Sequence, residues 1–312
     1  MRALLLSIGL FALSFSSFAA TDTAALRINA DTLVAQKKYG EAEAIYTGIL
    51  KTDSTRADIY SRRAMTYSND GKYQEAYNDY SKALSLHPDD PYLYEDRGDF
   101  LLMINMQDEA ASDFSTAIVF AKDPVMRREL YDFRSSARAL KRDFDGALAD
   151  VEKVLSEDSL NLGALIGISH YLVEMKRVND ALVYGQKAVR HYPDDARLYN
   201  NLALIYVELG RYNEALEINN KAVKLDKEPA LPYNNRGFVK YKLNDLEGAL
   251  ADINKSLELY PTNSFALKNR ALVYIAQNKT DLACKDLKEA EKQAFKSMYG
   301  DEVDELMAKY CK

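Results

Sequence analysis

The chain has 312 residues, of which 47% are hydrophobic and 28% are charged, and its formal net charge at pH 7 is -6. This composition is too apolar for a disordered chain. The acidic balance and the absence of any Lys/Arg block argue against a nucleic-acid-binding function, which needs a basic surface to displace phosphate counterions.

Residues 1–19 have the features of an export signal. Arg2 precedes an apolar run over residues 4–15, and a Ser-Phe-Ala triplet ending at Ala19 predicts a cleavage site. No cysteine lies near this site, so a lipid anchor is not expected. We therefore expect an exported protein, periplasmic or secreted, without membrane insertion after cleavage. An uncleaved membrane anchor is the alternative.

An alanine recurs along the chain at a spacing of 34 residues, lengthened once to 37, which indicates an internal repeat. The alanines in register are Ala42, Ala76, Ala110, Ala147, Ala181, Ala215, Ala249 and Ala283. They define eight repeats over 23–56, 57–90, 91–124, 128–161, 162–195, 196–229, 230–263 and 264–297, with three extra residues before the fourth.

Each repeat reads as two short amphipathic helices joined by a turn. A large apolar residue, often Tyr, occupies position 4, and proline falls at position 32 in three repeats, where a helix must stop. Position 15 favours residues that tolerate a left-handed backbone, which ends the first helix. The residues concerned are Gly71, Asn105, Gly210, Asn244 and Asn278.

This combination resembles the tetratricopeptide repeat, and the likeness covers residues 23–297. The resemblance implies an all-α fold, a right-handed α-solenoid of eight helix pairs whose first helices line a concave groove. Residues 298–312 predict a capping helix, because Val303, Leu306, Met307 and Tyr310 share one helical face. A single helix pair cannot cover its own apolar face, so stacking is also expected on physical grounds.

Arg at position 7 occurs only together with Asp at position 23, which predicts an ion pair between the two helices of a repeat. A half-buried guanidinium without its carboxylate is costly, whereas an apolar pair in place of both can be neutral. The other three repeats have uncharged residues at both positions. The predicted pairs are Arg63 with Asp79, Arg97 with Asp113, Arg134 with Asp150, Arg236 with Asp252, and Arg270 with Asp286.

Cys284 and Cys311 are the only cysteines, and both lie near the C-terminus. In an exported protein an even count favours a disulfide, which here would join the capping helix to the last repeat. Two buried free thiols are the alternative.

The groove positions implied by the tetratricopeptide resemblance carry amides and apolar residues in the C-terminal half. The candidates for peptide binding are Asn200, Asn201, Leu204, Asn234, Asn235, Phe238, Asn269 and Leu272. The amides look like the asparagine ladder of O-linked N-acetylglucosamine transferases, which implies contacts with the backbone of an extended peptide. Two alternatives stay open: Asn is common in the repeat consensus, and the apolar residues can pack between first helices. In the third repeat, Glu95, Asp96 and Asp99 favour a basic ligand segment.

No catalytic or metal-binding constellation is recognisable in the sequence. His87, His170 and His191 have no second ligand at metal spacing, and no phosphate loop or nucleophile elbow is present. We therefore predict no enzymatic activity and no cofactor.

The sequence thus predicts a non-enzymatic scaffold that binds a protein or extended peptide in its concave groove. The C-terminal segment with its final Tyr-Cys-Lys resembles periplasmic tetratricopeptide proteins of the Bacteroidota. A structural or assembly subunit of a cell-envelope complex, acting through its convex face, is the alternative. The identity of the partner and the oligomeric state do not follow from the sequence.

Overall fold

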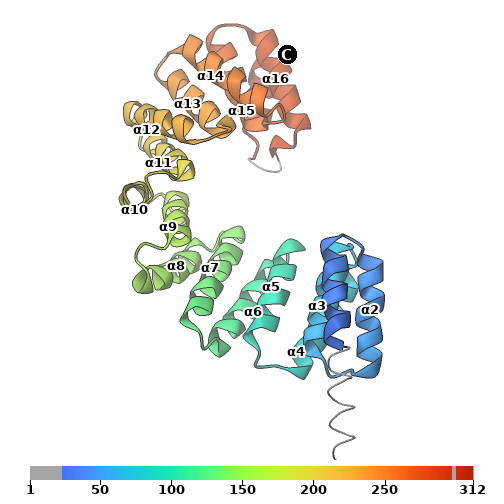
Figure 1. Ribbon diagram of the computed structural model, residues 1–312. Helices are drawn as coiled ribbons and strands as arrows, with labels where there is room; N and C mark the ends of the chain where they lie inside the picture. The colour runs from blue at the N-terminus through green and yellow to red at the C-terminus, as the bar shows by residue number, and fades with distance from the viewer. Residues whose placement is uncertain (1–22, 297–299, 312) are drawn as a thin grey trace, which may run out of the picture. The chain divides into compact units, whose positions relative to one another are not determined.

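Figure 1 shows the computed structural model of the protein, which describes residues 23–296 and 300–311. The predicted export signal lies outside these residues. Chain contacts divide the molecule into two compact units: unit 1 ends at Lys153, and unit 2 begins at Val154. The described residues form helices and turns without any β-strand, which confirms the predicted all-α solenoid of helix pairs.

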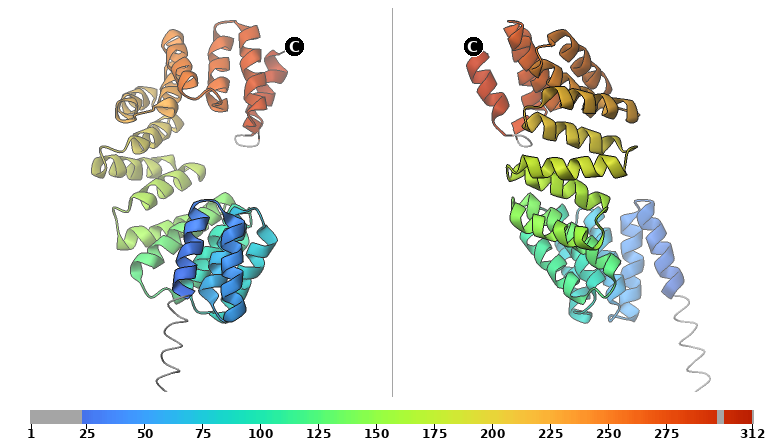
Figure 2. Two further views of the ribbon diagram at one scale, coloured as in Figure 1. Left: turned by 45° about the vertical axis from the view of Figure 1, so that its right-hand side comes forward. Right: turned by 90° about the vertical axis from the view of Figure 1, so that its left-hand side faces the viewer.

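Helices alternate between the first and the second position of successive repeats (Figures 1 and 2). The first helices comprise residues 23–35 and then α3 (Ala57–Asn69), α5 (Pro91–Met103), α7 (Pro124–Leu140), α9 (Leu162–Glu174), α11 (Ala196–Glu208), α13 (Ala230–Lys242) and α15 (Ser264–Ala276). The second helices are α2 (Tyr39–Thr52), α4 (Tyr73–Leu86), α6 (Gln107–Phe120), α8 (Phe144–Glu157), α10 (Val178–His191), α12 (Tyr212–Leu225), α14 (Leu246–Leu259) and α16 (Thr280–Lys292). The unit boundary falls within α8.

Polar caps start many of the first helices. Asp90, Asp123, Asn161, Asp195 and Asn263 each accept a hydrogen bond from a backbone N–H of the helix that follows. These bonds satisfy donors that have no partner inside the helix, and they fix where each helix begins.

The three extra residues of the chain lie in α7, which is about one turn longer than α5. This helix has 17 residues, whereas α5 has 13, and it begins at Pro124 after the Asp123 cap. Proline fits here because the first turn of a helix has no acceptor for its backbone N–H. The insertion therefore extends a helix rather than a loop.

Close packing of each helix pair depends on the recurring alanine, because a small side chain lets two helices approach. The eight alanines are all 0% exposed: Ala42, Ala76, Ala110, Ala147, Ala181, Ala215, Ala249 and Ala283. Gly237 allows an even closer approach, since a Cβ on this residue would lie 2.6 Å from Ile253.

All eight residues at position 15 have a left-handed backbone, with φ between 59° and 76°. The Gly and Asn residues predicted from the sequence adopt it, and so do three residues that carried no such signal: Lys37, Arg142 and Lys176. The first helix therefore ends at this position whatever residue occupies it. In these three repeats the residue has a Cβ atom, so its left-handed backbone is strained.

Helix α18 (Glu302–Tyr310) covers the end of the last repeat, as predicted for the capping helix. Val303 is 1% exposed and packs in a cluster with Leu287 of α16 and Phe295. Among the described residues, no helix combines the length and the apolar character that crossing a membrane requires.

Candidate functional site: the first-helix face

All five predicted Arg–Asp pairs form bidentate ion pairs between the two helices of their repeat. Arginine Nε and Nη2 donate to the two carboxylate oxygens over 2.5 to 2.9 Å. The aspartate side chains are 4–11% exposed and the arginines 15–23% exposed. This geometry makes the arginines structural and leaves them little capacity to bind a partner.

The third nitrogen of each guanidinium reaches back to the preceding repeat, a contact that the sequence analysis missed. The acceptors all stand at position 25 of that repeat: Thr47, Ser81, Ser115, Asn220 and Asn254. A signal for this contact exists, because a short polar side chain occupies position 25 before every Arg-bearing repeat. Each arginine therefore joins two helices of its own repeat and one helix of the previous repeat.

The predicted asparagine ladder is present as a chain of side-chain hydrogen bonds between adjacent first helices of unit 2. Asn269 donates to Asn234 over 3.0 Å, Asn234 donates to Asn235 over 3.3 Å, and Asn235 donates to Asn200 over 2.7 Å. The carboxamides thus bond to one another across the repeats. These hydrogen bonds hold α11, α13 and α15 in register.

Burial determines which of these amides can contact a ligand. Asn234 and Asn269 are each 1% exposed, so the expectation that they line an open groove is wrong. Their side chains lie in the contact between neighbouring first helices, where the amide of Asn269 donates a hydrogen bond to that of Asn234. Asn200, Asn201 and Asn235 stay partly exposed and can still bond to a partner.

We call the surface formed by α11, α13 and α15 the first-helix face of unit 2. Leu204 of α11 is 42% exposed on it, and Leu231 of α13 is 55% exposed. Phe238 and Leu272 are half-buried. We call Leu204, Leu231, Phe238 and Leu272 the apolar strip; packing between first helices covers part of it, and the remainder faces solvent.

Two lysines adjoin this strip, and the sequence analysis did not select either of them. Lys268 replaces the asparagine found at position 5 in the two preceding repeats, which was the available signal. Its side chain is 4% exposed and pairs with Glu302 of α18 over 3.1 Å. Burial lowers the pKa of Lys268, and the charge of Glu302 acts in the opposite direction. Lys242 lies on the exposed side of the same face.

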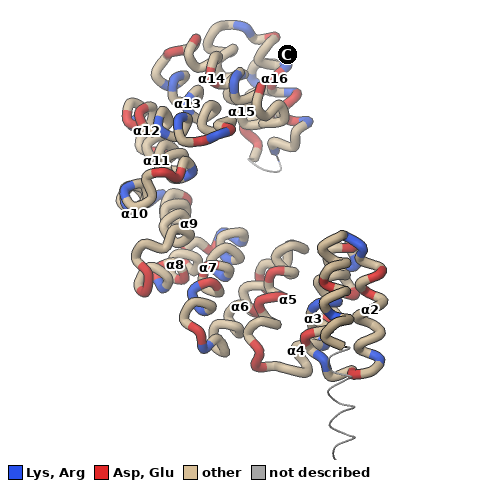
Figure 3. The backbone as a smooth tube through the Cα atoms, viewed as in Figure 1, with Lys and Arg blue, Asp and Glu red and all other residues tan. Residues whose placement is uncertain are grey.

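Unit 1 carries carboxylates at the corresponding positions of α5, where Figure 3 shows several acidic residues. Burial raises the pKa of Glu95 to about 7, and the charges of Asp99, Asp96 and Glu129 add to the effect. The pKa values of Asp96 and Asp99 are raised as well, mainly by burial. Asp96 accepts a hydrogen bond from Ser61 of α3. This part of the chain thus holds close like charges in partly buried surroundings.

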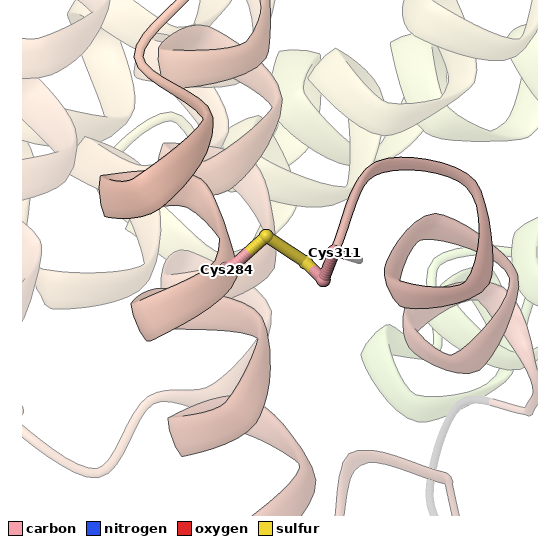
Figure 4. The surroundings of a disulfide bond; sticks show 2 residues. All are labelled: Cys284 and Cys311. Atoms are coloured by element: carbon pink, nitrogen blue, oxygen red, sulfur yellow. A yellow bond between two sulfur atoms is a disulfide. The ribbon is translucent and has the colours of Figure 1, made fainter.

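Cys284 of α16 and Cys311 after α18 are joined by a disulfide, with their Cα atoms 5.6 Å apart (Figure 4). The bond ties the capping helix to the second helix of the last repeat. The alternative of two free thiols does not apply in this structure. Within the described part of the chain, no group of three or more His, Cys, Asp or Glu residues is arranged to hold a metal ion.

Family models described as tetratricopeptide repeat match three segments of the chain, over residues 57–90, 172–231 and 231–263. These three segments match the tetratricopeptide repeat and together cover less than half of the chain. Among curated proteins, the chain is 23% identical over 192 residues to the DnaJ protein P58IPK homolog B of Oryza sativa subsp. japonica, covering 57% of this chain and 40% of that protein. It is 28% identical over 142 residues to RNA polymerase II-associated protein 3 of Mus musculus, covering 46% of this chain and 20% of that protein. The chain spans less than half the length of these relatives.

Solved structures share the architecture at low sequence identity. A tetratricopeptide repeat protein from Parabacteroides merdae aligns with a TM-score of 0.63 and 18% identity, covering 80% of this chain and 98% of the other. The Cut9 and Hcn1 hetero-tetramer of the APC/C gives a TM-score of 0.60 and 19% identity, covering 92% of this chain and 55% of the matched chain. At such identities the likeness concerns the fold alone.

Proposed function

We propose that the protein is a non-enzymatic scaffold that binds an extended peptide segment of a partner protein on the first-helix face of unit 2. The observation that supports this proposal is the exposure of Leu204 and Leu231 on adjacent first helices, beside the partly exposed amides of Asn200 and Asn235. Exposed apolar residues next to partly exposed amides suit an extended chain, which brings both side chains and a polar backbone.

The tetratricopeptide fold supports a role in protein interaction, since the repeats build a continuous surface and no single catalytic loop. The first-helix face is the better candidate within that fold because its polar groups are already ordered by the amide chain. Preordered side chains lose less conformational entropy on binding. The proposal also includes export from the cytoplasm, which rests on the leader-like residues 1–19.

Site-specific photo-crosslinking tests the choice of surface. A photoreactive residue replaces Leu204 or Leu231 on the first-helix face, and Val183 serves as the matched control on the second helix α10, where it is 63% exposed. The experiment is carried out in the native envelope fraction, and the cross-linked species are compared by mass. We expect a discrete adduct from Leu204 and Leu231 that Val183 does not give.

Introducing negative charges provides the complementary measurement. Leu204→Asp with Leu231→Asp removes the adduct formed from a probe at Asn201, while Val183→Asp leaves it unchanged, because only the first pair lines the proposed contact. Adducts from Val183 alone would instead favour the alternative, an assembly subunit that acts through its second-helix surface.

A further inference from the structure

Lys268 stands out because a charged group is buried on a surface proposed to bind a partner. Its side chain is 4% exposed, and its ammonium lies 4.3 Å from the ring centre of Phe265 and 5.7 Å from that of Phe238. Two ring faces stabilise the cation in part. Its carboxylate partner is Glu302, whose two oxygens lie at 3.1 and 3.2 Å.

A second ammonium shares one of these rings. The Nζ atom of Lys242 lies 5.1 Å from the ring centre of Phe238 and 5.7 Å from that of Tyr241. Its charge contributes to the lowered pKa of Lys268. Among the described residues, Lys242 has no carboxylate partner, so Glu302 pairs with only one of the two ammonium groups around Phe238.

Glu302 occupies its place because α18 is fixed, not because its own side chain is enclosed. Val303 is buried beside it, and the disulfide between Cys284 and Cys311 holds the far end of the helix. The Glu302 side chain itself is 51% exposed. It can therefore turn into solvent at small cost, whereas Lys268 cannot leave its burial site.

We propose that the α13–α15 end of the first-helix face recognises a Glu or Asp side chain of an extended partner peptide, with Glu302 as an intramolecular stand-in for that carboxylate. The proposal rests on the function proposed above and specifies its partner as an acidic segment. Charge complementarity supports this choice, since the incoming carboxylate replaces Glu302 beside Lys268 and adds negative charge near Lys242, which has no carboxylate partner among the described residues. The exposed Leu231, on the same helix as Lys242, continues the surface for apolar residues of the same segment.

A pair of synthetic peptides tests the proposal by fluorescence anisotropy with the full mature chain. The acidic probe has the sequence Leu-Ser-Leu-Ser-Leu-Ser-Glu-Ser-Glu, with a labelled N-terminus and an amidated C-terminus, so that only side chains supply carboxylates. Alternate residues of an extended peptide lie on one side, which presents its Leu and Glu side chains together. The reference probe carries Gln in place of both Glu residues.

Four variants separate the acidic site from general electrostatics. Glu302→Gln removes the stand-in and should tighten binding of the acidic probe by roughly 10-fold, the effect of one charged hydrogen bond. Glu305→Gln makes the same charge change on the exposed side of α18 and should have little effect. Lys268→Met should weaken the acidic probe by roughly 10-fold or more and leave the Gln probe unchanged. Lys242→Gln, at an exposed position, should give a smaller loss and does not depend on tolerance of a core change.

Three results would overturn the proposal. Equal binding of the Glu and Gln probes would show that no carboxylate is recognised. An equal gain from Glu302→Gln and Glu305→Gln would show an effect of net charge alone. Failure of both probes to bind either the wild type or Glu302→Gln would also reject it. The crosslinks from Leu204 and Leu231 report on the proposed function independently, so a positive crosslink with any of these results rejects only the acidic partner.

Discussion

Removing Arg97 while leaving Asp113 in place should destabilise the third repeat strongly. Asp113 has a side chain that is 7% exposed, and it accepts two guanidinium hydrogen bonds of 2.7 and 2.8 Å. In Arg97→Leu this carboxylate stays buried without its counter-charge, which costs about 3 kcal/mol, the lower end of the range for breaking a buried pair. The lower end applies because Arg97 is 20% exposed, so water screens part of the charge.

The double variant Arg97→Leu with Asp113→Leu should recover most of the lost stability. The fifth and sixth repeats show that the same frame accepts apolar residues, since Ile168 and Leu202 occupy position 7 and are 1% and 2% exposed. We expect the double variant to lie within about 1 kcal/mol of the wild type. Arg197→Leu is the surface control, because Arg197 is 72% exposed in its pair with Asp195 and should contribute less than about 1 kcal/mol.

Urea unfolding followed by circular dichroism measures the overall effect, and hydrogen exchange of α5 and α6 locates it. Exchange in α14 of unit 2 serves as the internal reference, because repeats interact mainly with their neighbours. A double variant as unstable as Arg97→Leu alone would refute the pairing argument.

Four further changes follow from the same structure. Asn219 is 0% exposed, and no described residue hydrogen-bonds to either polar atom of its side chain. Asn219→Leu keeps the number of heavy atoms and removes these unpaired polar atoms, so it should raise the unfolding free energy by about 1–3 kcal/mol in urea titrations. Lys176 has φ of 60°, so Lys176→Gly should stabilise by about 0.5–1 kcal/mol, and an unchanged or lower melting temperature would contradict the strain argument. The raised pKa of Glu95 means that the folded form binds the Glu95 proton more tightly than the unfolded form does. The unfolding free energy should therefore rise as the pH falls from about 7 towards 4.5. Glu95→Gln should reduce this pH dependence, which is measured from urea midpoints across that range. Replacing Cys284 and Cys311 by Ser opens a loop of sequence separation 27, which should lower the unfolding free energy by about 3.5 kcal/mol. Hydrogen exchange in α18 should become faster, whereas unchanged exchange would show that packing alone holds the capping helix.

The repeat pattern was sufficient to predict the fold because each of its features has a local cause. The alanines mark where helices cross, and Gly or Asn at position 15 marks a left-handed end. The sequence missed Lys37, Arg142 and Lys176 at this position, since a lysine or arginine carries no local sign of left-handed backbone. In these repeats the stacking of neighbouring repeats imposes the turn, so tertiary packing overrides the backbone preference of the residue at position 15.

The candidate site was harder to predict because the same residue type serves opposite roles. Asn234 and Asn235 are adjacent in the chain, yet the first is 1% exposed and the second is partly open. Position in the repeat indicates the direction of each side chain but not whether its hydrogen bonds are used by the next repeat. That information depends on the distance between neighbouring first helices, which a single sequence does not contain.

Internal pairing therefore separates the residues that build this solenoid from those that remain for a partner. The position 7 arginines and the amides of Asn234 and Asn269 make hydrogen bonds across repeat boundaries, and replacing them should alter stability first. Leu231 and Lys242 have no comparable internal use among the described residues, one being an exposed apolar side chain and the other a cation without a carboxylate partner. Lys268 lies between these two classes, since it is buried like a structural residue but paired with a half-exposed carboxylate that a ligand can replace. For this reason Glu302→Gln is the informative change: it alters what the face can bind while leaving every interaction between the repeats in place.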